Sequence, residues 1–426
     1  MMNAMPARSR CDPSHRPPQS QRLASYVMSE ACDMELSARS AANGDRPFIL
    51  IWEVTQACDL ACLHCRACAQ PQRSLLELST QEGEDLIRQV RELRVPVFVL
   101  TGGDPLKRPD IYHLVEYGTS LGVRVSLSPS ATPLLTREAL AQLKASGLMR
   151  LAISLDGSSA ALHDHFRGVA GSYDRVLQAI RWAHELGLPV QVNSTMTRHN
   201  VHDFDALARL MESLEVVLWS VFFLVPTGRG KTEDLLSGEE FERLFEKLYE
   251  LSSRVSFDVK TTEAMHYRRF FVQRRTEEKK ADPESAAQRS RGPLWLKSSV
   301  LSQPGADGIP RAARGINDAK GFVFVSHAGE VYPSGFLPLS GGNIRQRPLA
   351  EIYREAPLFV ALRNPDNLKG KCGVCEYREI CGGSRARAYA LTGDPFSAEP
   401  CCIHQPKHVD ASRLSNHLLT PEVVSA

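Results

Sequence analysis

Hydrophobic residues from position 47 onward alternate between short apolar runs and longer segments with apolar residues on one helical face. The short runs are rich in Val, Ile and Phe, which predicts strands. Ser79 and Glu82 form a capping-box pattern before a helix with Leu86 and Val90 on one face. Six strands are predicted at residues 48–55, 95–103, 122–128, 148–157, 188–195 and 216–226. Helices are predicted between them, which favours parallel βα units in an α/β fold.

Changes in composition and hydrophobic pattern divide the chain into five parts. Residues 1–46 mix Pro, Ser, Arg and Gln without hydrophobic period, which predicts a disordered extension. Residues 47–262 contain the strand and helix alternation and one further expected strand. Residues 263–314 include a charged, aperiodic stretch and are predicted to be a linker or loop. Residues 315–410 contain a second group of cysteines and are expected to form a small domain, followed by a tail at 411–426.

Composition excludes several classes of partner. The chain has 51 basic and 49 acidic side chains, so neither a nucleic-acid footprint nor a membrane-surface patch is predicted. No apolar run has the length of a transmembrane helix, and no signal peptide is recognised, so a cytoplasmic location is expected. Eleven cysteines in a reducing compartment favour metal ligands over disulfides.

Cys58, Cys62 and Cys65 follow the first predicted strand with the spacing Cys-x3-Cys-x2-Cys. Three thiolates on one loop can hold three irons of a cubane cluster and leave the fourth iron free for a small molecule. The alternatives are a zinc knuckle or buried thiols, although zinc requires four ligands and only Cys68 or His64 could supply the fourth. We expect Cys68 to be a bystander, since its ligation would close the free iron.

A second group contains Cys372, Cys375, Cys381 and Cys401, with Cys402 directly after the last of them. Four thiolates from a compact segment can fully ligate a [4Fe-4S] cluster or a zinc ion. The spacing does not choose between these metals. Cys401 is the predicted fourth ligand, and Cys402 is its substitute if the register differs by one residue.

The first cysteine motif resembles that of the radical S-adenosylmethionine (SAM) enzymes, and His64 occupies a position where this superfamily carries an aromatic side chain. The resemblance implies a partial (βα)6 TIM-like barrel with its chemistry at the carboxyl ends of the strands. It also implies a [4Fe-4S] cluster that is chelated by SAM and cleaves it reductively to a 5′-deoxyadenosyl radical, which abstracts hydrogen. Cys58, Cys62 and Cys65 would then be both metal ligands and catalytic residues.

Gly102, Gly103, Asp104 and Pro105 follow the second strand and resemble the GGE/DP element of the same superfamily. The resemblance implies that their backbone groups bind the amino group of SAM. Glycine permits a close backbone approach, and Asp104 is placed to cap the next helix. An ordinary turn is the alternative.

Ser154 ends the fourth strand, and Arg167 lies in the HDHFRG segment after it. By resemblance these two residues would contact the ribose and carboxylate of SAM. The alternative is a turn and a surface arginine. Residues 193–195 and 225–228 also end strands, where they either line the pocket or satisfy backbone polar groups.

The C-terminal region has a predicted hairpin around HAGE and resembles the SPASM domain of radical SAM enzymes, which carries auxiliary clusters. Ser334 and Ser384 stand where relatives have cysteines for one of two clusters. We therefore expect one auxiliary [4Fe-4S] cluster. The surrounding sequence resembles the heme synthase and heme d1 maturase branch, and also mycofactocin-type peptide maturases.

This branch implies an oxidoreductase that acts on tetrapyrrole propionates or on a peptide, with a reducing partner such as flavodoxin or ferredoxin. Arg385 and Arg387 would pair with substrate carboxylates if their segment is extended. A hypothesis of another class is a non-catalytic iron–sulfur or zinc-binding protein. The intact first motif and the strand-end motifs argue against it.

Overall fold

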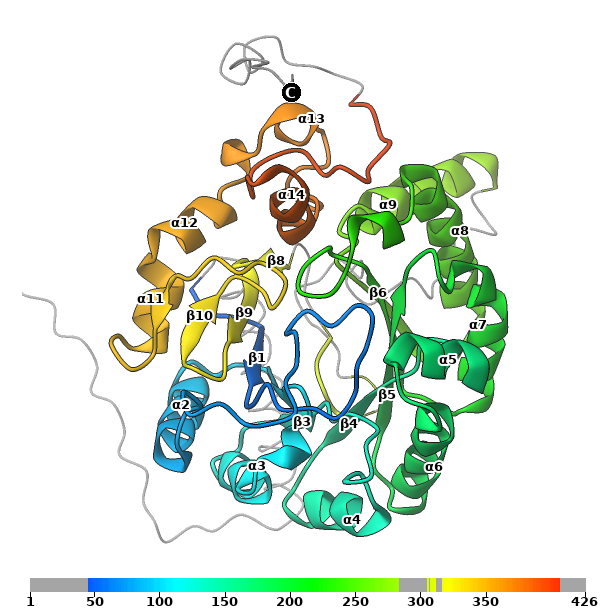
Figure 1. Ribbon diagram of the computed structural model, residues 1–426. Coiled ribbons are helices and arrows are strands. Elements are labelled where there is room, and N and C mark those ends of the chain that lie inside the picture. Colours follow the sequence, from blue (N-terminus) through cyan, green and yellow to red (C-terminus); the bar gives the residue numbers. More distant parts are fainter. Residues whose placement is uncertain (1–44, 283–304, 306, 312–315, 407–426) are drawn as a thin grey trace, which may run out of the picture.

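A curved sheet with helices on its outer side forms the main body of the computed structural model (Figure 1). The structure describes residues 45–282, 305, 307–311 and 316–406. The predicted extension lies outside these residues except for its last two positions, and the predicted tail at 411–426 lies entirely outside them. Within the described residues, every helix is too short or too polar to cross a membrane.

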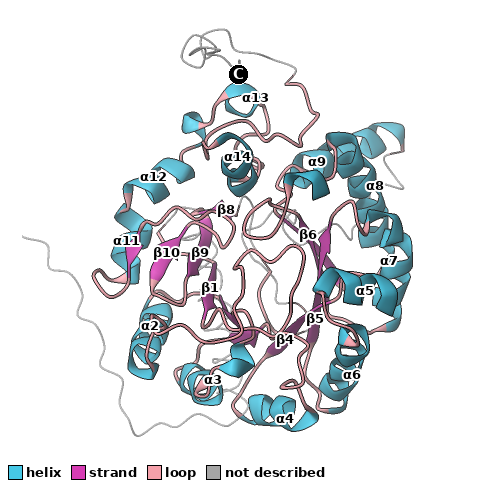
Figure 2. Cartoon of the chain, viewed as in Figure 1, coloured by secondary structure: helices cyan, strands magenta, loops and turns pink. Residues whose placement is uncertain are grey.

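Seven parallel strands lie next to one another in chain order. They are β1 (Ile49–Glu53), β2 (Val97–Thr101), β3 (Val125–Leu127), β4 (Arg150–Ser154), β5 (Val190–Met196), β6 (Leu218–Phe223) and β7 (Asp258–Thr262). The connecting helices are α2 (Thr80–Glu92), α3 (Ile111–Ser120), α4 (Arg137–Ala145), α5 (Ala160–Arg167), α6 (Ser172–Glu185), α7 (Phe204–Ser213) and α8 (Gly238–Arg254). Figure 2 shows the helices outside the strands. The expected partial barrel is confirmed, with β7 as the further strand.

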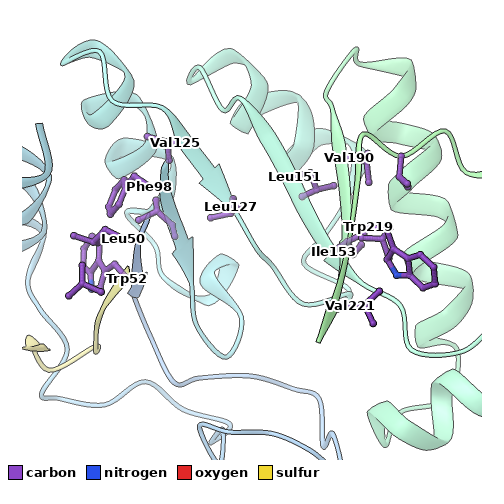
Figure 3. Packing of buried hydrophobic residues seen from close by; sticks show 14 of the residues in the cluster. Leu50, Trp52, Phe98, Val125, Leu127, Leu151, Ile153, Val190, Trp219 and Val221 are labelled. Atoms are coloured by element: carbon purple, nitrogen blue, oxygen red, sulfur yellow. The ribbon is translucent and has the colours of Figure 1, made fainter. Parts of the chain in front are cut away.

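The two faces of the sheet differ in polarity because side chains alternate along each strand. On β5, Val190 and Val192 are fully buried, whereas Gln191 and Asn193 are half-buried. The buried set packs against the helices, and Figure 3 shows this layer with Trp219 among its labelled residues. The half-buried set, which includes Gln191 and Asn193, lines the concave inner face of the sheet. Polar side chains therefore remain accessible on that face.

Local signals in the sequence decide the helix boundaries. Ser79 and Glu82 form the expected capping box at the start of α2. The Thr136 side chain accepts a hydrogen bond from the Ala139 amide and begins α4. Gly147, with φ of 91°, follows the end of that helix, as expected for a residue that tolerates the left-handed conformation.

The C-terminal unit continues the barrel sheet instead of forming a separate one. Strand β9 (Gly321–Val325) pairs in parallel with β1, so that Leu50 lies opposite Val323. The expected hairpin is present, since β9 pairs antiparallel with β10 (Glu330–Tyr332). The other elements of this unit are β8 (Asn317–Asp318), β11 (Gly342–Asn343), α11 (Leu349–Glu355), α12 (Pro357–Arg363), α13 (Gly370–Gly373) and α14 (Arg385–Thr392).

Helix α9 (Tyr267–Ala281) occupies the first part of the segment 263–314 that the sequence predicts to be a loop. The apolar residues of α9 gather in its first turns, so its charged second half shows no helical period. Polar contacts to α8 hold it, including the Arg274–Glu246 ion pair at 3.0 Å. Residues 283–304 lie outside the described part of the chain.

Candidate functional site

Cys58, Cys62 and Cys65 lie on the long loop that follows β1 and pack together in one small buried cluster. The Leu60 amide donates to Cys58 Sγ at 3.3 Å, and the Ala69 amide donates to Cys65 Sγ at 3.5 Å. Backbone N–H groups directed at sulfur stabilise thiolates that bind iron. The donor set therefore fits a metal–thiolate centre.

The Gly102–Pro105 motif holds this loop in place. The Gly103 amide donates to the Thr55 carbonyl at 2.8 Å, and the Asp104 amide donates to the Ala57 carbonyl at 2.6 Å. A Cβ atom on Gly103 would lie 2.5 Å from the Ala57 oxygen, so a larger residue cannot take its place without moving the loop. The motif thus positions the cysteine loop against the end of β2.

Asp104 has a structural role inside the protein. Its side chain is fully buried, caps the short helix Pro105–Lys107 through the Leu106 amide, and accepts a hydrogen bond from Thr132 at 2.6 Å. Burial raises the pKa of its carboxyl group. The expected capping role is confirmed, and the carboxylate is already fully used by protein donors.

His64 and Arg167 surround the second cysteine of the motif. The His64 ring stacks on Phe166 with centroids 4.4 Å apart, and burial lowers the pKa of His64 well below its usual range. Arg167 Nη1 lies 3.6 Å from Cys62 Sγ, and its Nη2 forms an ion pair with Asp156. Although burial opposes the charge, Asp156 and Cys62 raise the pKa of Arg167. Arg167 is therefore a fixed cation beside the cysteine loop.

Two residues near the loop were missed by the sequence analysis. Ser130 Oγ lies 3.4 Å from Cys58 Sγ and donates to the Gly103 carbonyl at 2.7 Å. The Arg229 amide donates to the Cys65 carbonyl at 2.9 Å. Both residues follow the carboxyl ends of strands, β3 and β6, so the strand-end rule would have found them.

Cys68 is exposed and adopts a positive φ of 47°. We expect the Cys68→Ala variant to leave the cluster and its response to SAM unchanged, because the thiol is not packed with the other three. EPR spectra of the reduced protein with and without SAM test this. A wild-type spectrum that is insensitive to SAM but becomes sensitive in the variant would show a closed four-cysteine site.

A cavity beside the C-terminal unit, called here the auxiliary cavity, is lined by Cys372, Cys375, Cys381 and Cys402. Each of the first three sulfurs accepts a backbone N–H, from Glu399 at 3.2 Å, Tyr377 at 3.4 Å and Gly383 at 3.4 Å. The donor chemistry therefore fits a metal centre here as well.

Cys401, the predicted fourth ligand, does not line this cavity. It is buried and packs in the main hydrophobic core. Its backbone amide donates to Glu399 Oε1 at 3.1 Å. The structure thus brings Cys402, the sequence alternative, to the other three cysteines.

The two serines at the lost cysteine positions contact buried carboxyl groups. Ser384 Oγ donates to Glu263 at 2.5 Å, and Ser334 contacts Asp318. Burial raises the pKa of Glu263 to about 8. Both serines therefore take part in hydrogen bonds with buried carboxyl groups of the protein.

The expectation that Arg385 and Arg387 bind substrate carboxylates is wrong. Ser384 caps the helix α14, so the segment is not extended, and residues two apart on a helix do not share a face. Both side chains are buried. Arg387 pairs with Glu399 at 2.9 Å and donates to the Leu224 carbonyl at the end of β6. Arg387 therefore joins the C-terminal unit to the barrel, whereas Arg385 donates to the Pro395 and Ser397 carbonyls within that unit.

Replacing Arg387 by Leu is expected to destabilise the protein by about 3–5 kcal/mol, because Glu399 would keep a buried, unpaired charge. Despite burial, Arg387 lowers the pKa of Glu399 to about 2. The pair therefore stabilises the fold above the unfolded carboxyl pKa of about 4.3, and this contribution is lost as the pH falls toward 2.

Anaerobic urea unfolding at pH 7 measures this effect. The control is Arg347→Leu, which breaks a partly exposed ion pair with Glu351 and should cost below about 1 kcal/mol. The double variant Arg387→Leu with Glu399→Leu should recover much of the loss. Equal losses in Arg387→Leu and Arg347→Leu would contradict the assigned role.

Comparisons with known proteins agree with this geometry. The model of the radical SAM superfamily matches residues 52–211, which include the cysteine loop and the Gly102–Pro105 motif. The AdoMet-dependent heme synthase of Methanosarcina barkeri is 39% identical over 86% of this chain and 99% of its own length. The chain belongs to the radical SAM superfamily. The AdoMet-dependent heme synthase of Nitratidesulfovibrio vulgaris is 38% identical over 89% of this chain and 100% of its own length.

This radical SAM protein also shares its fold with solved structures. The structure of Streptococcus suis SuiB bound to S-adenosylmethionine superposes with a TM-score of 0.62 at 18% identity, covering 84% of this chain and 78% of that one. Relatives of lower identity are named Fe-coproporphyrin III synthase (29%), pre-heme d1 synthase (27%) and mycofactocin maturase (28%). The predicted resemblance is confirmed, and the chain is an enzyme.

Proposed function

We propose that this enzyme binds SAM at a [4Fe-4S] cluster held by Cys58, Cys62 and Cys65 and uses it to oxidise a tetrapyrrole. The cluster, when bound and reduced, supplies the electron that cleaves SAM to a 5′-deoxyadenosyl radical. The observation that carries the proposal is that the buried Cys58 and Cys62 and the partly buried Cys65 pack together on one loop, with backbone N–H groups directed at the sulfurs of Cys58 and Cys65. A fourth protein ligand is absent from this packed set.

The residues around the loop have distinct roles in this proposal. Gly102 and Gly103 keep the loop next to the sheet and present backbone groups to the SAM amino group. Arg167 lies beside Cys62 Sγ, where it stabilises the thiolate, and it would bind the SAM carboxylate. Ser154, half-buried at the end of β4, would bind the ribose.

The auxiliary cavity holds one further [4Fe-4S] cluster, with Cys402 as its fourth ligand in place of Cys401. The supporting observation is that Cys372, Cys375, Cys381 and Cys402 line one cavity. Such a cluster is the class of acceptor needed for an electron that leaves the substrate. A flavodoxin or a ferredoxin would supply the electron for SAM cleavage.

The named relatives support a heme-type substrate. Heme carries vinyl groups where Fe-coproporphyrin III carries propionates. Converting one propionate to a vinyl group releases one CO2, one hydrogen atom and one electron. The hydrogen atom passes to the deoxyadenosyl radical, which leaves as 5′-deoxyadenosine, and the electron passes to the acceptor. Each vinyl group therefore consumes one SAM.

The test is anaerobic reconstitution followed by reaction with SAM, dithionite and Fe-coproporphyrin III. We expect about eight irons per chain, 5′-deoxyadenosine formation and loss of carboxylates from the porphyrin by mass spectrometry. Deoxyadenosine formation with an unchanged porphyrin would reject the tetrapyrrole substrate. No deoxyadenosine under any condition would reject the radical SAM activity.

A further inference from the structure

The inner face of the barrel carries a lysine whose charge has no counter-ion among the residues that the structure describes. Lys260 lies in the middle of β7 and is half-buried. In the part of the chain that the structure describes, its ammonium group has no hydrogen bond or ion pair. A charge in such a place is costly unless a partner compensates for it.

Strand register places Lys260 level with the predicted SAM contact. Ser154 of β4 lies opposite Asn193 of β5, Asn193 lies opposite Ser220 of β6, and Ser220 lies opposite Lys260. Ser220 Oγ lies 3.2 Å from Thr262 Oγ1, two residues beyond Lys260, so these side chains share the inner face. Lys260 is therefore three strand spacings, about 14 Å along the sheet, from Ser154.

The surroundings of Lys260 are strongly basic. Burial and the charges of Arg150, Arg311 and Arg268 lower the pKa of Lys260 to about 8. The nearby carboxylates are already paired, since Asp307 binds Arg150 at 2.8 Å and Arg311 at 2.9 Å.

The remaining polar partners are also committed. Asp258, the other acidic residue of this group, pairs with Arg311 at 2.7 Å. Arg268 donates to the carbonyl groups of Ile316 and Ile380. Four cations thus share two carboxylates. Of the two cations without a carboxylate, Arg268 is hydrogen-bonded to carbonyl groups, whereas Lys260 has no such acceptor among the described residues.

We propose that Lys260 binds a carboxylate of the molecule held against the inner face, and that this molecule is the substrate. This inference rests on the proposed function and identifies where its carboxylate-bearing substrate is recognised. Lys260 lies on β7, next to β6, and the segment after β6 contacts the cysteine loop through the Arg229 amide and the Cys65 carbonyl. A carboxylate beside Lys260 would pair with an ammonium group that no described side chain neutralises.

Anaerobic absorption titrations with Fe-coproporphyrin III test the proposal in the holoenzyme. Lys260→Met, which keeps the length but removes the charge, is expected to weaken porphyrin binding about tenfold or more. Lys260→Arg should keep the affinity within about threefold because it retains the charge. Lys247→Met is the matched control, since Lys247 is exposed and pairs with Asp205 at 2.6 Å.

Titration with SAM alone, followed by EPR, shows whether Lys260 binds the carboxylate of SAM or a carboxylate of the porphyrin. Unchanged SAM binding in Lys260→Met supports the substrate assignment. Weaker SAM binding with normal porphyrin binding would assign Lys260 to the cofactor and overturn the proposal. Equal affinities of wild type and Lys260→Met for both molecules would also overturn it.

Thermal unfolding distinguishes a binding role from a structural one. Removing an unpaired charge from a basic environment should leave the melting temperature of Lys260→Met unchanged or raise it. A clear decrease would indicate a structural role and contradict the proposal. If wild-type protein binds the porphyrin but does not decarboxylate it, the proposed reaction is rejected. The role of Lys260 is still tested in that case, because the porphyrin affinities of wild type and Lys260→Met can be compared.

A second observation concerns His266, which lines the auxiliary cavity with the four cysteines. Its side chain is fully buried between Phe241 and Phe245, with ring centroids 5.0 and 4.9 Å away. Neither ring nitrogen has a hydrogen-bond partner among the described residues. Burial lowers the pKa of His266 to about 3, so the ring is neutral and carries one N–H.

We infer that His266 donates this N–H to sulfur in the auxiliary cavity and raises the reduction potential of the cluster proposed there. Hydrogen bonds to cluster sulfurs favour the reduced, more negative state. His266 is thus a positioning residue for electron acceptance. It acts through the cluster and not on the substrate.

EPR redox titration of the auxiliary cluster measures this effect. His266→Phe, which keeps a ring but no donor, should shift the one-electron equilibrium about tenfold toward the oxidised form, about 59 mV lower. His266→Asn, which keeps a donor, should recover most of the shift. Equal potentials in wild type and His266→Phe, or equal shifts in both variants, would overturn the inference. Loss of about four irons in either variant would show that His266 holds the cluster and would overturn it as well.

Discussion

Replacing Cys58, Cys62 and Cys65 together by Ala is expected to abolish 5′-deoxyadenosine formation completely. The reason is that all three sulfurs come from one loop and pack in one cluster, so no described residue can substitute for them. The iron content should fall from about eight to about four per chain, because the four cysteines of the auxiliary cavity are not on the cysteine loop. Chromatography of deoxyadenosine and an iron assay measure both effects.

The matched variant is Cys372→Ala, which removes one ligand of the auxiliary cavity. It should retain uncoupled SAM cleavage but stop product formation, because the acceptor for the substrate electron is lost. If both variants lose SAM cleavage equally, the second cysteine group is mainly structural. Residual deoxyadenosine in the triple variant would remove the basis of the proposed function.

Single substitutions of the adjacent residues Cys401 and Cys402 should show which of them is the fourth ligand at the auxiliary cavity. Cys402→Ala is expected to lose about four irons and all product formation, because Cys402 lines the cavity with Cys372, Cys375 and Cys381. Cys401→Ala should keep the irons and show only a modest loss of stability, since Cys401 is a small buried core residue. Iron counts, EPR spectra and melting temperatures distinguish the two outcomes.

The reverse result would restore the assignment made from the sequence. A Cys401→Ala variant that loses its irons while Cys402→Ala keeps them would show that the cavity rearranges when metal binds. If both single variants keep eight irons, neither cysteine is essential. The fourth ligand would then have to be sought elsewhere on the cavity wall, where His404 and Glu399 also lie.

Most of the barrel could be predicted from local pattern. The apolar runs of the strands and the capping residues Ser79 and Thr136 act within a few positions of the elements that they define. Helix α9 was missed because long-range ion pairs such as Arg269–Glu242 hold it, and these leave no periodic signal. The continuation of the barrel sheet by β9 was missed because its partner β1 lies far away in the sequence.

The sequence by itself determined the superfamily and the candidate ligands of the first proposed metal site, because Cys58, Cys62 and Cys65 lie on one short loop whose spacing is visible in the chain. Tertiary structure decided the remaining assignments, since these depend on which distant segments meet. It buried Arg387 against Glu399 and brought Cys402 to the auxiliary cavity. It also placed Lys260 level with Ser154 through the register of four strands. The spacing of residues along the chain cannot specify which residues of neighbouring strands lie opposite one another, because strand register is set by packing across the whole sheet.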